Sequence, residues 1–230
     1  MKGIFYGIGI GPGDPEHITL KAVRMMKEVD VIAAPGTDVK ETLAYRIAVQ
    51  AVPEIEQKEM LPIDMPMTMD KELLLKAHKH GAETIEKVLE DGKSLGFITL
   101  GDTTVYSTFS YLEKIVKGHG FETVYISGIT SFCAAAASLG IPLTEWQEPL
   151  HVIPAVHQLD DKLALDGSYV LMKSGRQMPK VKEILRASGR KVNMVENCGL
   201  PDEKKYYSVE DIPDGAGYFS LIIAKENKKK

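Results

Sequence analysis

The stretch GIFYGIGIGPGD, residues 3–14, decides how the first part of the chain folds. Residues 3–10 are rich in isoleucine and aromatic side chains, which is typical of a buried strand, and the glycines that follow indicate a turn. Pro15 then suits the first turn of a helix, and apolar residues at helical spacing continue to about residue 28. The stretch therefore predicts a strand, a glycine turn and a helix in succession.

The same order of strand, turn and helix recurs along the first half of the chain. Short apolar runs predict further strands at residues 30–34, 57–63, 94–100 and 121–126. Helical periodicity lies between them, at residues 40–52, 71–90 and 104–117. Strands that alternate with helices favour a parallel, doubly wound α/β sheet.

The second half of the chain has a different pattern, in which strands predominate. Helices are predicted at residues 131–139, where small side chains prevail, and at 179–188. Strands are predicted at residues 151–156, 168–173, 191–196 and 217–224. This pattern favours a second α/β domain with a mixed sheet. We place the domains at residues 1–117 and 118–230, with the junction somewhere between Lys117 and Glu145.

Composition argues against several classes of function. The 230 residues carry 28 Lys+Arg against 32 Asp+Glu, a net charge of −4, which argues against nucleic acid as a partner. No apolar stretch approaches the ~20 residues that span a bilayer, and no secretion signal precedes the first strand. Cys133 and Cys198 are too few for a disulfide framework and lack metal-ligand spacing. We therefore expect a cytoplasmic protein with no membrane partner and no protein-bound metal.

Four turns of glycine or small polar residues follow predicted strands, at residues 9–14, 101–104, 127–131 and 197–199. In open α/β sheets, ligands bind beyond the carboxyl ends of the strands, so these turns are candidates for a binding edge. For each turn taken alone, simple reversal of the chain is an equally open interpretation.

The first of these turns departs from the known nucleotide-binding patterns. Gly7 and Gly9 are followed by Pro12 where G-x-G-x-x-G requires its third glycine. The second strand ends in Ala-Pro-Gly without an acid to bind a ribose, and no Gly-Lys-Ser/Thr is present. A classical nucleotide site is therefore disfavoured here, and Asp14 is interpreted first as a cap for the following helix.

The second and third turns offer polar groups beside close-packing backbone. Gly101 allows a ligand to approach the main chain, and Asp102 offers a carboxylate or a carbonyl oxygen. Thr130 and Ser131 place two hydroxyls before a run of alanines, so that this helix can pack against a flat ligand. A tightly packed core helix explains the same alanines.

Taken together, three segments resemble one family, the tetrapyrrole (corrin/porphyrin) methyltransferases. The segments are GIGIGPGDPEHITLKA at residues 7–22, GDTTVYST at 101–108 and GITSFCAAA at 128–136, and the resemblance covers nearly the whole chain. It implies a two-domain, non-Rossmann (class III) fold and a homodimer. It also implies S-adenosylmethionine (SAM) as the methyl donor, bound in a cleft between the domains, and a tetrapyrrole as the substrate.

The resemblance also assigns ligand-binding residues by position. It implies SAM binding by Leu100, Gly101, Asp102, Val105, Tyr106, Thr130, Ser131, Met172, Asn197 and Cys198. It implies that the first loop borders the tetrapyrrole, through Gly11, Pro12, Gly13 and Asp14. Asp14 is then either a helix cap or a group that faces the pyrrole nitrogens.

The run YSTFSYL at residues 106–112 resembles the branch of the family that methylates carbon 20 of precorrin-2 or cobalt-factor II in cobalamin biosynthesis. The relatives that methylate uroporphyrinogen carry an acidic base near the position of Pro35, which this chain lacks. Methylation at another corrin carbon, of a different tetrapyrrole or of a protein (as in diphthamide synthesis) stays open, as does a protein that binds SAM or a tetrapyrrole without catalysis.

No catalytic residue is assigned from the sequence. Methyl transfer from a sulfonium depends mainly on position and exclusion of water. Groups that could accept a substrate proton are Asp14, Asp102, Tyr106, His151 and His157.

Overall fold

The computed structural model describes residues 2–66, 68, 70–154 and 163–227. The chain forms two compact units, Met1–Thr130 and Ser131–Lys230. The first unit extends beyond Lys117 because the strand that follows this residue pairs with the first strand of the chain. The sequence-based boundary separated that strand from its own sheet.

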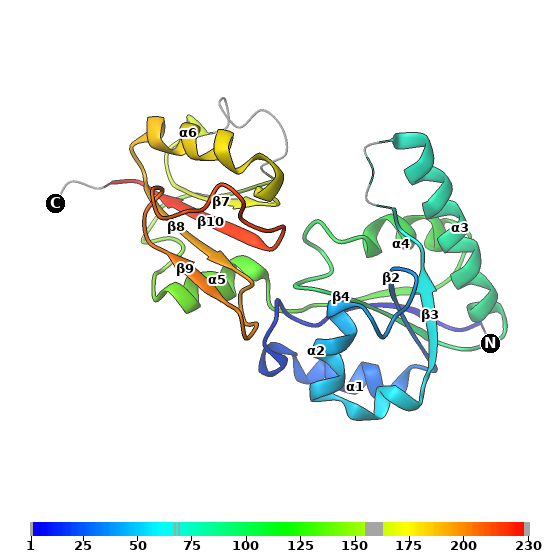
Figure 1. Cartoon of the computed structure of the whole chain (residues 1–230). Coiled ribbons are helices and arrows are strands. Elements are labelled where there is room, and N and C mark those ends of the chain that lie inside the picture. The colour runs from blue at the N-terminus through cyan, green and yellow to red at the C-terminus, as the bar shows by residue number, and fades with distance from the viewer. Residues whose placement is uncertain (1, 67, 69, 155–162, 228–230) are drawn as a thin grey trace. The chain divides into compact units, whose positions relative to one another are not determined.

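The first unit is built on a parallel sheet of five strands (Figure 1). The strands are β1 (Phe5–Gly9), β2 (Val31–Pro35), β3 (Glu59–Ile63), β4 (Leu95–Thr99) and β5 (Thr123–Ile126). Their order is β3-β2-β4-β1-β5, so β1 lies between β4 and β5. The predicted parallel α/β sheet is confirmed, and the carboxyl ends of β1, β4 and β5 are neighbours.

Helices cover both faces of this sheet (Figure 1). They are α1 (Leu20–Glu28), α2 (Leu43–Ala51), α3 (Lys71–Glu90) and α4 (Phe109–Gly118). Side chains of α3 and α4, such as Ile85 and Leu112, pack with Phe5 and Phe97 of the sheet in one buried cluster. Apolar side chains of alternating strand positions are thereby removed from water, which is the main contribution to the stability of the unit.

Two helices begin later than the sequence predicted. Asp14 caps only a short 3-10 turn, η1 (Pro15–His17), and Thr19 is the residue that caps α1. Likewise α4 begins at Phe109 rather than near residue 104, because Tyr106 has a left-handed backbone (φ 49°) that a helix cannot contain. The predictions of a helix from Pro15 and from residue 104 were therefore wrong at their starts.

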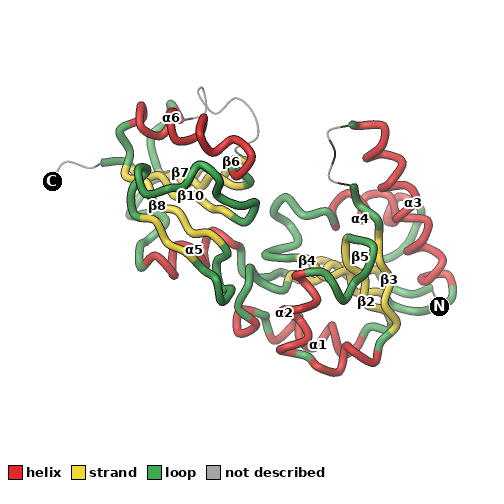
Figure 2. Tube along the Cα trace, viewed as in Figure 1, coloured by secondary structure: helices red, strands yellow, loops and turns green. Residues whose placement is uncertain are grey.

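The second unit has a mixed sheet of five strands between two helices, as Figure 2 shows. The strands are β6 (Leu150–Pro154), β7 (Ser168–Met172), β8 (Lys191–Glu196), β9 (Lys204–Tyr206) and β10 (Ser220–Lys225). Their order is β6-β7-β10-β8-β9, in which only β6 and β7 form a parallel pair. The mixed sheet predicted for this domain is confirmed, whereas the three-residue β9 was not predicted.

The alternation of side chains along these strands separates two cores. Val170, Val195 and Ile223 face α5 (Ser131–Leu139). Tyr169 and Ile222 face α6 (Met178–Ser188), which follows the short 3-10 turn η4 (Gly175–Gln177). Strand neighbours point to opposite faces, so a helix is needed on each side to exclude water.

Candidate functional site

The turns that follow β1, β4 and β5 meet at backbone contact distance. A Cβ atom placed on Gly128 would lie 2.2 Å from the carbonyl oxygen of Gly101 and 2.8 Å from the carbonyl carbon of Gly9. A Cβ on Gly9 would lie 2.7 Å from the amide nitrogen of Gly128. Cβ contacts this short do not occur in real proteins, so Gly9 and Gly128 must both be glycine. We call Gly9, Gly101 and Gly128 the glycine junction.

Hydrogen bonds between main-chain atoms fix the first two turns to each other. The amide of Gly101 donates to the carbonyl of Gly11 at 2.7 Å, and the amide of Gly11 donates back to Gly101 at 3.2 Å. Both residues have positive φ, 76° for Gly11 and 70° for Gly101. Left-handed backbone of this kind is available to glycine at little cost. The sequence prediction of a shared edge is thus confirmed for these two turns.

Asp102 ties the second turn to the third. Its side chain is buried, and Oδ2 accepts a hydrogen bond from the Gly128 amide at 2.9 Å. Oδ1 accepts from the Thr104 amide at 2.7 Å and from the Thr104 hydroxyl. Next to it, the fully buried Thr103 donates to the carbonyl of Ile126 at 3.3 Å. Both carboxylate oxygens therefore accept hydrogen bonds from within the first unit.

The other residues of this unit that are expected to bind SAM lie close in sequence to Gly101 or Gly128. Leu100 and Val105 are half-buried, and Tyr106 is 47% exposed. Thr130 closes the unit with a half-buried side chain, four residues after β5 ends. Their role as SAM contacts stays a prediction.

The first loop holds Asp14 in a local turn. Asp14 Oδ1 accepts a hydrogen bond from the Glu16 amide at 2.8 Å, which is an N-cap of the 3-10 turn. Gly11 and Gly13 are buried, and Pro12 is half-buried. Of the two roles left open by the sequence, the structure supports a capping role, although the capped element is η1 rather than α1. The role of residues 11–14 at a substrate stays a prediction.

Replacing Asp14 with alanine is expected to cost about 1 kcal/mol of unfolding free energy, because one amide loses its cap. Catalytic rate and substrate KM are expected to stay within twofold of the wild-type values, since the carboxylate serves the turn. Urea denaturation and steady-state kinetics check the two parts. A large rise in substrate KM with unchanged stability would show instead that Asp14 faces the substrate.

In the second unit, Met172 ends β7 with a half-buried side chain that packs against the cluster on the α5 face. The chain then turns through Lys173, whose φ is 60°. Burial lowers the pKa of the Lys173 ammonium. At Gly175, an added Cβ would lie 2.5 Å from the carbonyl oxygen of Gly217, so this turn also requires glycine. Met172 thus lies directly before a turn whose backbone is fixed.

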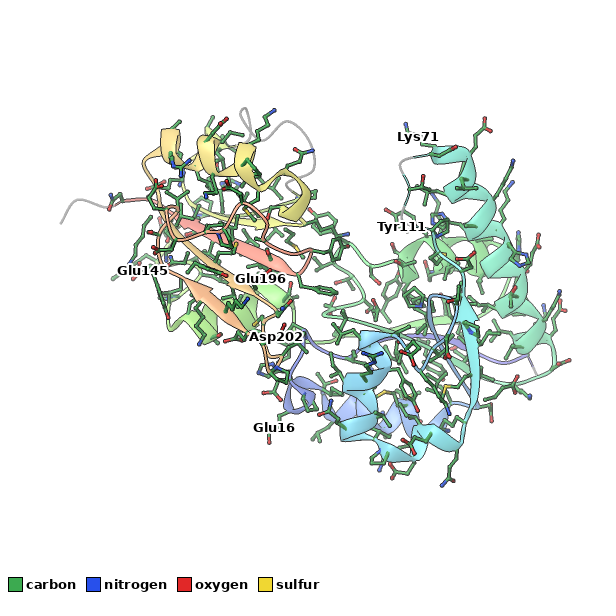
Figure 3. All side chains as sticks on the ribbon, viewed as in Figure 1. Glu16, Lys71, Tyr111, Glu145, Glu196 and Asp202 are labelled. Atoms are coloured by element: carbon green, nitrogen blue, oxygen red, sulfur yellow. The ribbon has the colours of Figure 1, made fainter. Side chains whose placement is uncertain are left out.

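The turn after β8 contains Asn197 and Cys198. Asn197 has a left-handed backbone (φ 55°). Its side chain donates at 2.7 Å to Asp202, which is labelled in Figure 3. Cys198 packs against the same hydrophobic cluster as Met172. This cluster includes residues of α5, the helix that begins at Ser131. Burial, with the charge and hydrogen bond of Glu203 as further causes, raises the pKa of the Cys198 thiol to about 12. Cys198 is therefore a packing group and not a nucleophile at neutral pH.

The difference between the two cysteines is open to a direct test. Cys133 is exposed on α5, whereas burial raises the pKa of the Cys198 thiol to about 12, so that this thiol stays protonated at pH 8. Iodoacetamide is expected to modify Cys133 first and to leave Cys198 unmodified, as peptide mass spectrometry would show. Unfolding in guanidinium should make both react. Equal labelling of the two thiols in the native protein would contradict the burial of Cys198.

His151, one of the candidates for a proton acceptor, makes its contacts within the second unit. The His151 ring stacks on Tyr169 with centroids 4.6 Å apart, and its Nε2 lies 2.9 Å from the carbonyl oxygen of Asp166. These contacts give His151 a structural role. His157 lies outside the described residues. With Asp14 and Asp102 bonded within the protein, no catalytic base is assigned.

Two further properties bear on the class of site. Within residues 2–66, 68, 70–154 and 163–227, no group of three or more His, Cys, Asp or Glu is placed to hold a metal ion. Among the helices that the structure describes, none combines the length and apolar character needed to cross a membrane.

Several residues of these turns gave no signal in the sequence. Thr19 caps α1 by accepting from Ala22 at 3.2 Å and also donates to the carbonyl of Ser127 at 3.4 Å. Glu203 accepts from the amide of Gly199 at 2.7 Å. An isolated threonine or glutamate gives no recognisable sequence pattern. Ser127, the second partner of Thr19, is also distant in sequence.

Known proteins are similar in sequence to this chain over nearly its full length. The probable cobalt-precorrin-2 C(20)-methyltransferase of Methanocaldococcus jannaschii is 34% identical over 228 residues, which are 97% of this chain and 96% of that protein. The cobalt-precorrin-2 C(20)-methyltransferase of Salmonella typhimurium is 30% identical and covers 98% of both chains.

Solved structures have the same fold. A cobalt precorrin-4 methyltransferase superposes with a TM-score of 0.76 at 22% identity, covering 96% of this chain and 94% of its own. The uroporphyrin-III C-methyltransferase of Thermus thermophilus, solved with S-adenosylhomocysteine, gives 0.70 at 22% identity, covering 97% and 98%. The sequence model for "Tetrapyrrole (Corrin/Porphyrin) Methylases" matches residues 5–212. The chain belongs to this family of tetrapyrrole methylases.

Proposed function

We propose that this protein transfers the methyl group of SAM to carbon 20 of precorrin-2 or of its cobalt complex, in cobalamin biosynthesis. The observation that carries the proposal is similarity over the full length to two proteins named for that reaction, at 34% and 30% identity. Identity at this level along both units, together with the run at residues 106–112, favours this substrate over other tetrapyrroles.

In this proposal the methyl donor is bound largely by backbone. The first unit contributes Leu100, Gly101, Asp102, Val105, Tyr106 and Thr130, and the second contributes Ser131, Met172, Asn197 and Cys198. The glycine junction supports this assignment, because the close contact of its turns holds their main chain in a fixed position. The first loop borders the tetrapyrrole through Gly11, Pro12 and Gly13, whereas Asp14 caps the turn that follows.

Methyl transfer from SAM requires little acid–base catalysis by the protein. The bond between the donor methyl and the sulfonium sulfur breaks as a carbon–carbon bond forms at carbon 20, S-adenosylhomocysteine leaves, and the substrate loses one proton. The sulfonium is already a strong electrophile, so the protein contributes mainly orientation and exclusion of water. Turns fixed by glycine contacts and a buried carboxylate suit that task, since they hold backbone groups without adjustment on binding.

One feature of the chain supports this proposal over methylation of uroporphyrinogen. Pro35 ends β2, pairing in register with Ile63, at the position where those relatives are expected to carry an acid. Asp38, the next carboxylate along the chain, accepts from the Lys40 amide at 2.9 Å in a turn of its own. The side chains here do not supply the acidic base.

We also propose that the protein acts as a homodimer in the cytoplasm. Membership in the family supports both statements. Light scattering on the purified protein at working concentrations tests the first, and a monomer mass at all concentrations would contradict it.

Binding of the donor is tested before catalysis. Titration calorimetry of purified protein with SAM is expected to give one site per chain with a Kd in the micromolar range, typical of substrate levels. S-adenosylhomocysteine should compete for the same site. The absence of any SAM binding would contradict the proposed function, whereas binding without methyl transfer to any precorrin would favour a non-catalytic binding protein.

A further inference from the structure

Glu203 is a carboxylate that reaches three elements of the second unit. Its Oε1 accepts from the Ser138 hydroxyl of α5 at 2.5 Å, and its Oε2 accepts from the Gly199 amide at 2.7 Å. The Lys205 ammonium of β9 lies 3.3 Å from Oε1 and donates to the carbonyl of Ser138 at 2.7 Å. The Glu203 side chain is only 21% exposed. One side chain thus joins α5, the turn after β8 and β9.

The turn that Glu203 holds has an unusual backbone. Asn197 and Gly199 both have positive φ, 55° and 78°, and the Leu200 amide donates to the carbonyl of Asn197 at 3.0 Å. Asparagine enters the left-handed region more readily than other non-glycine residues, and here its side-chain bond to Asp202 helps to fix it. Asp202 serves the Asn197 side chain, which leaves Glu203 as the group that bonds the Gly199 amide.

The neighbouring carboxylate at the end of β8 has a different task. Glu196 Oε1 accepts from the Gly217 amide at 2.6 Å, and Oε2 lies 3.4 Å from the Tyr206 hydroxyl. Glu196 therefore anchors the segment before β10. Its contacts do not reach α5, so it cannot replace Glu203 between that helix and the turn.

Both elements that Glu203 connects carry residues of the proposed SAM site. Ser131 is the first residue of α5, and Asn197 and Cys198 form the turn. We propose that Glu203 is a positioning residue for SAM binding, which fixes the turn of residues 197–199 against α5 so that both present their groups to one ligand. This inference rests on the proposed function, because the SAM contacts are part of that proposal.

The charge of Glu203 is suited to this task. Burial opposes its ionisation, but the donors Ser138, Gly199 and Lys205 outweigh burial and lower the pKa of the carboxyl. A carboxylate with several donors forms stronger hydrogen bonds than a neutral amide, which can accept at one oxygen only. A glutamine at this position therefore keeps the shape but loses part of the connection.

The test compares E203Q with the matched variant E210Q in the full-length protein. Glu210 also pairs with a cation, through two 2.7 Å bonds to Arg186, but lies outside these contacts. SAM affinity is measured by calorimetry, and steady-state kinetics are measured with saturating tetrapyrrole. E203Q is expected to weaken SAM binding about tenfold and to raise the KM for SAM, with kcat at saturating SAM within about twofold, because uniform binding is lost. E210Q is expected to bind SAM as the wild type does.

A second variant tests the inference independently, in case E203Q does not fold. S138A removes one donor to Glu203 without placing a new group in the turn, and a roughly threefold loss of SAM affinity is expected. Wild-type SAM affinity in both folded variants, with only a lower Tm, would overturn the inference by showing a purely structural role. A wild-type protein that does not bind SAM would instead contradict the proposed function.

Discussion

Replacing Gly128 with alanine is expected to abolish measurable SAM binding and to lower the free energy of unfolding by about 3 kcal/mol. The added methyl would stand 2.2 Å from the Gly101 carbonyl oxygen and 2.8 Å from the carbonyl carbon of Gly9. Both are main-chain atoms of turns that are hydrogen-bonded or packed in place. The turns after β1, β4 and β5 must therefore separate, and the backbone proposed to hold the donor moves with them.

Gly118 provides the matched control for this substitution. It is the last residue of α4, and a Cβ placed on it would meet no atom within 4 Å. G118A is therefore expected to leave stability and SAM affinity unchanged or to stabilise the helix by up to about 1 kcal/mol. Urea denaturation and calorimetry on both variants measure the difference. A G128A protein with wild-type stability and SAM affinity would mean that the glycine junction does not exist in solution.

Replacing Asp102 with alanine is expected to cost about 2 kcal/mol of unfolding free energy and at least about tenfold in SAM affinity. The substitution leaves the Gly128 amide, which donates to Oδ2 at 2.9 Å, without its acceptor in a buried place. It also removes the acceptor of Thr104 in the same turn. The second and third turns then lose the side-chain hydrogen bond that joins them.

Two companion variants separate the causes. D102N keeps the shape and one acceptor oxygen, so losses smaller than those of D102A are expected. D38A removes an exposed carboxylate that accepts from the Lys40 amide at 2.9 Å, and stability within about 0.5 kcal/mol of wild type is expected. If D102A were as stable as D38A and bound SAM normally, the carboxylate would not be the connection described here.

The sequence was sufficient for most of the fold because its signals are local. Buried strands such as β1, β2 and β4 are continuous apolar runs, and the long α3 has a clear helical period. The misplaced helix starts show where local signals compete. Asp14 and Thr19 are both good caps, and the turn that Pro15 begins ended after three residues.

The candidate site was predicted only in part, for a related reason. Glycine turns at the ends of β1, β4 and β5 are visible in the sequence, and a parallel sheet places them together. The partners of their polar groups are not visible. Asp102 bonds an amide 26 residues away, and Ser138 bonds a carboxylate 65 residues away, so neither contact leaves a pattern in a local window.

In the proposed reaction, carbon 20 of a precorrin-2 macrocycle receives the methyl group. The direct measurement incubates the purified protein with SAM carrying a ¹³C-labelled methyl and with precorrin-2 or its cobalt complex, and then locates the label by NMR. The account predicts a mass increase of one methyl group, with the label at carbon 20. A label at another carbon, or no transfer to either substrate by a protein that binds SAM, would contradict it.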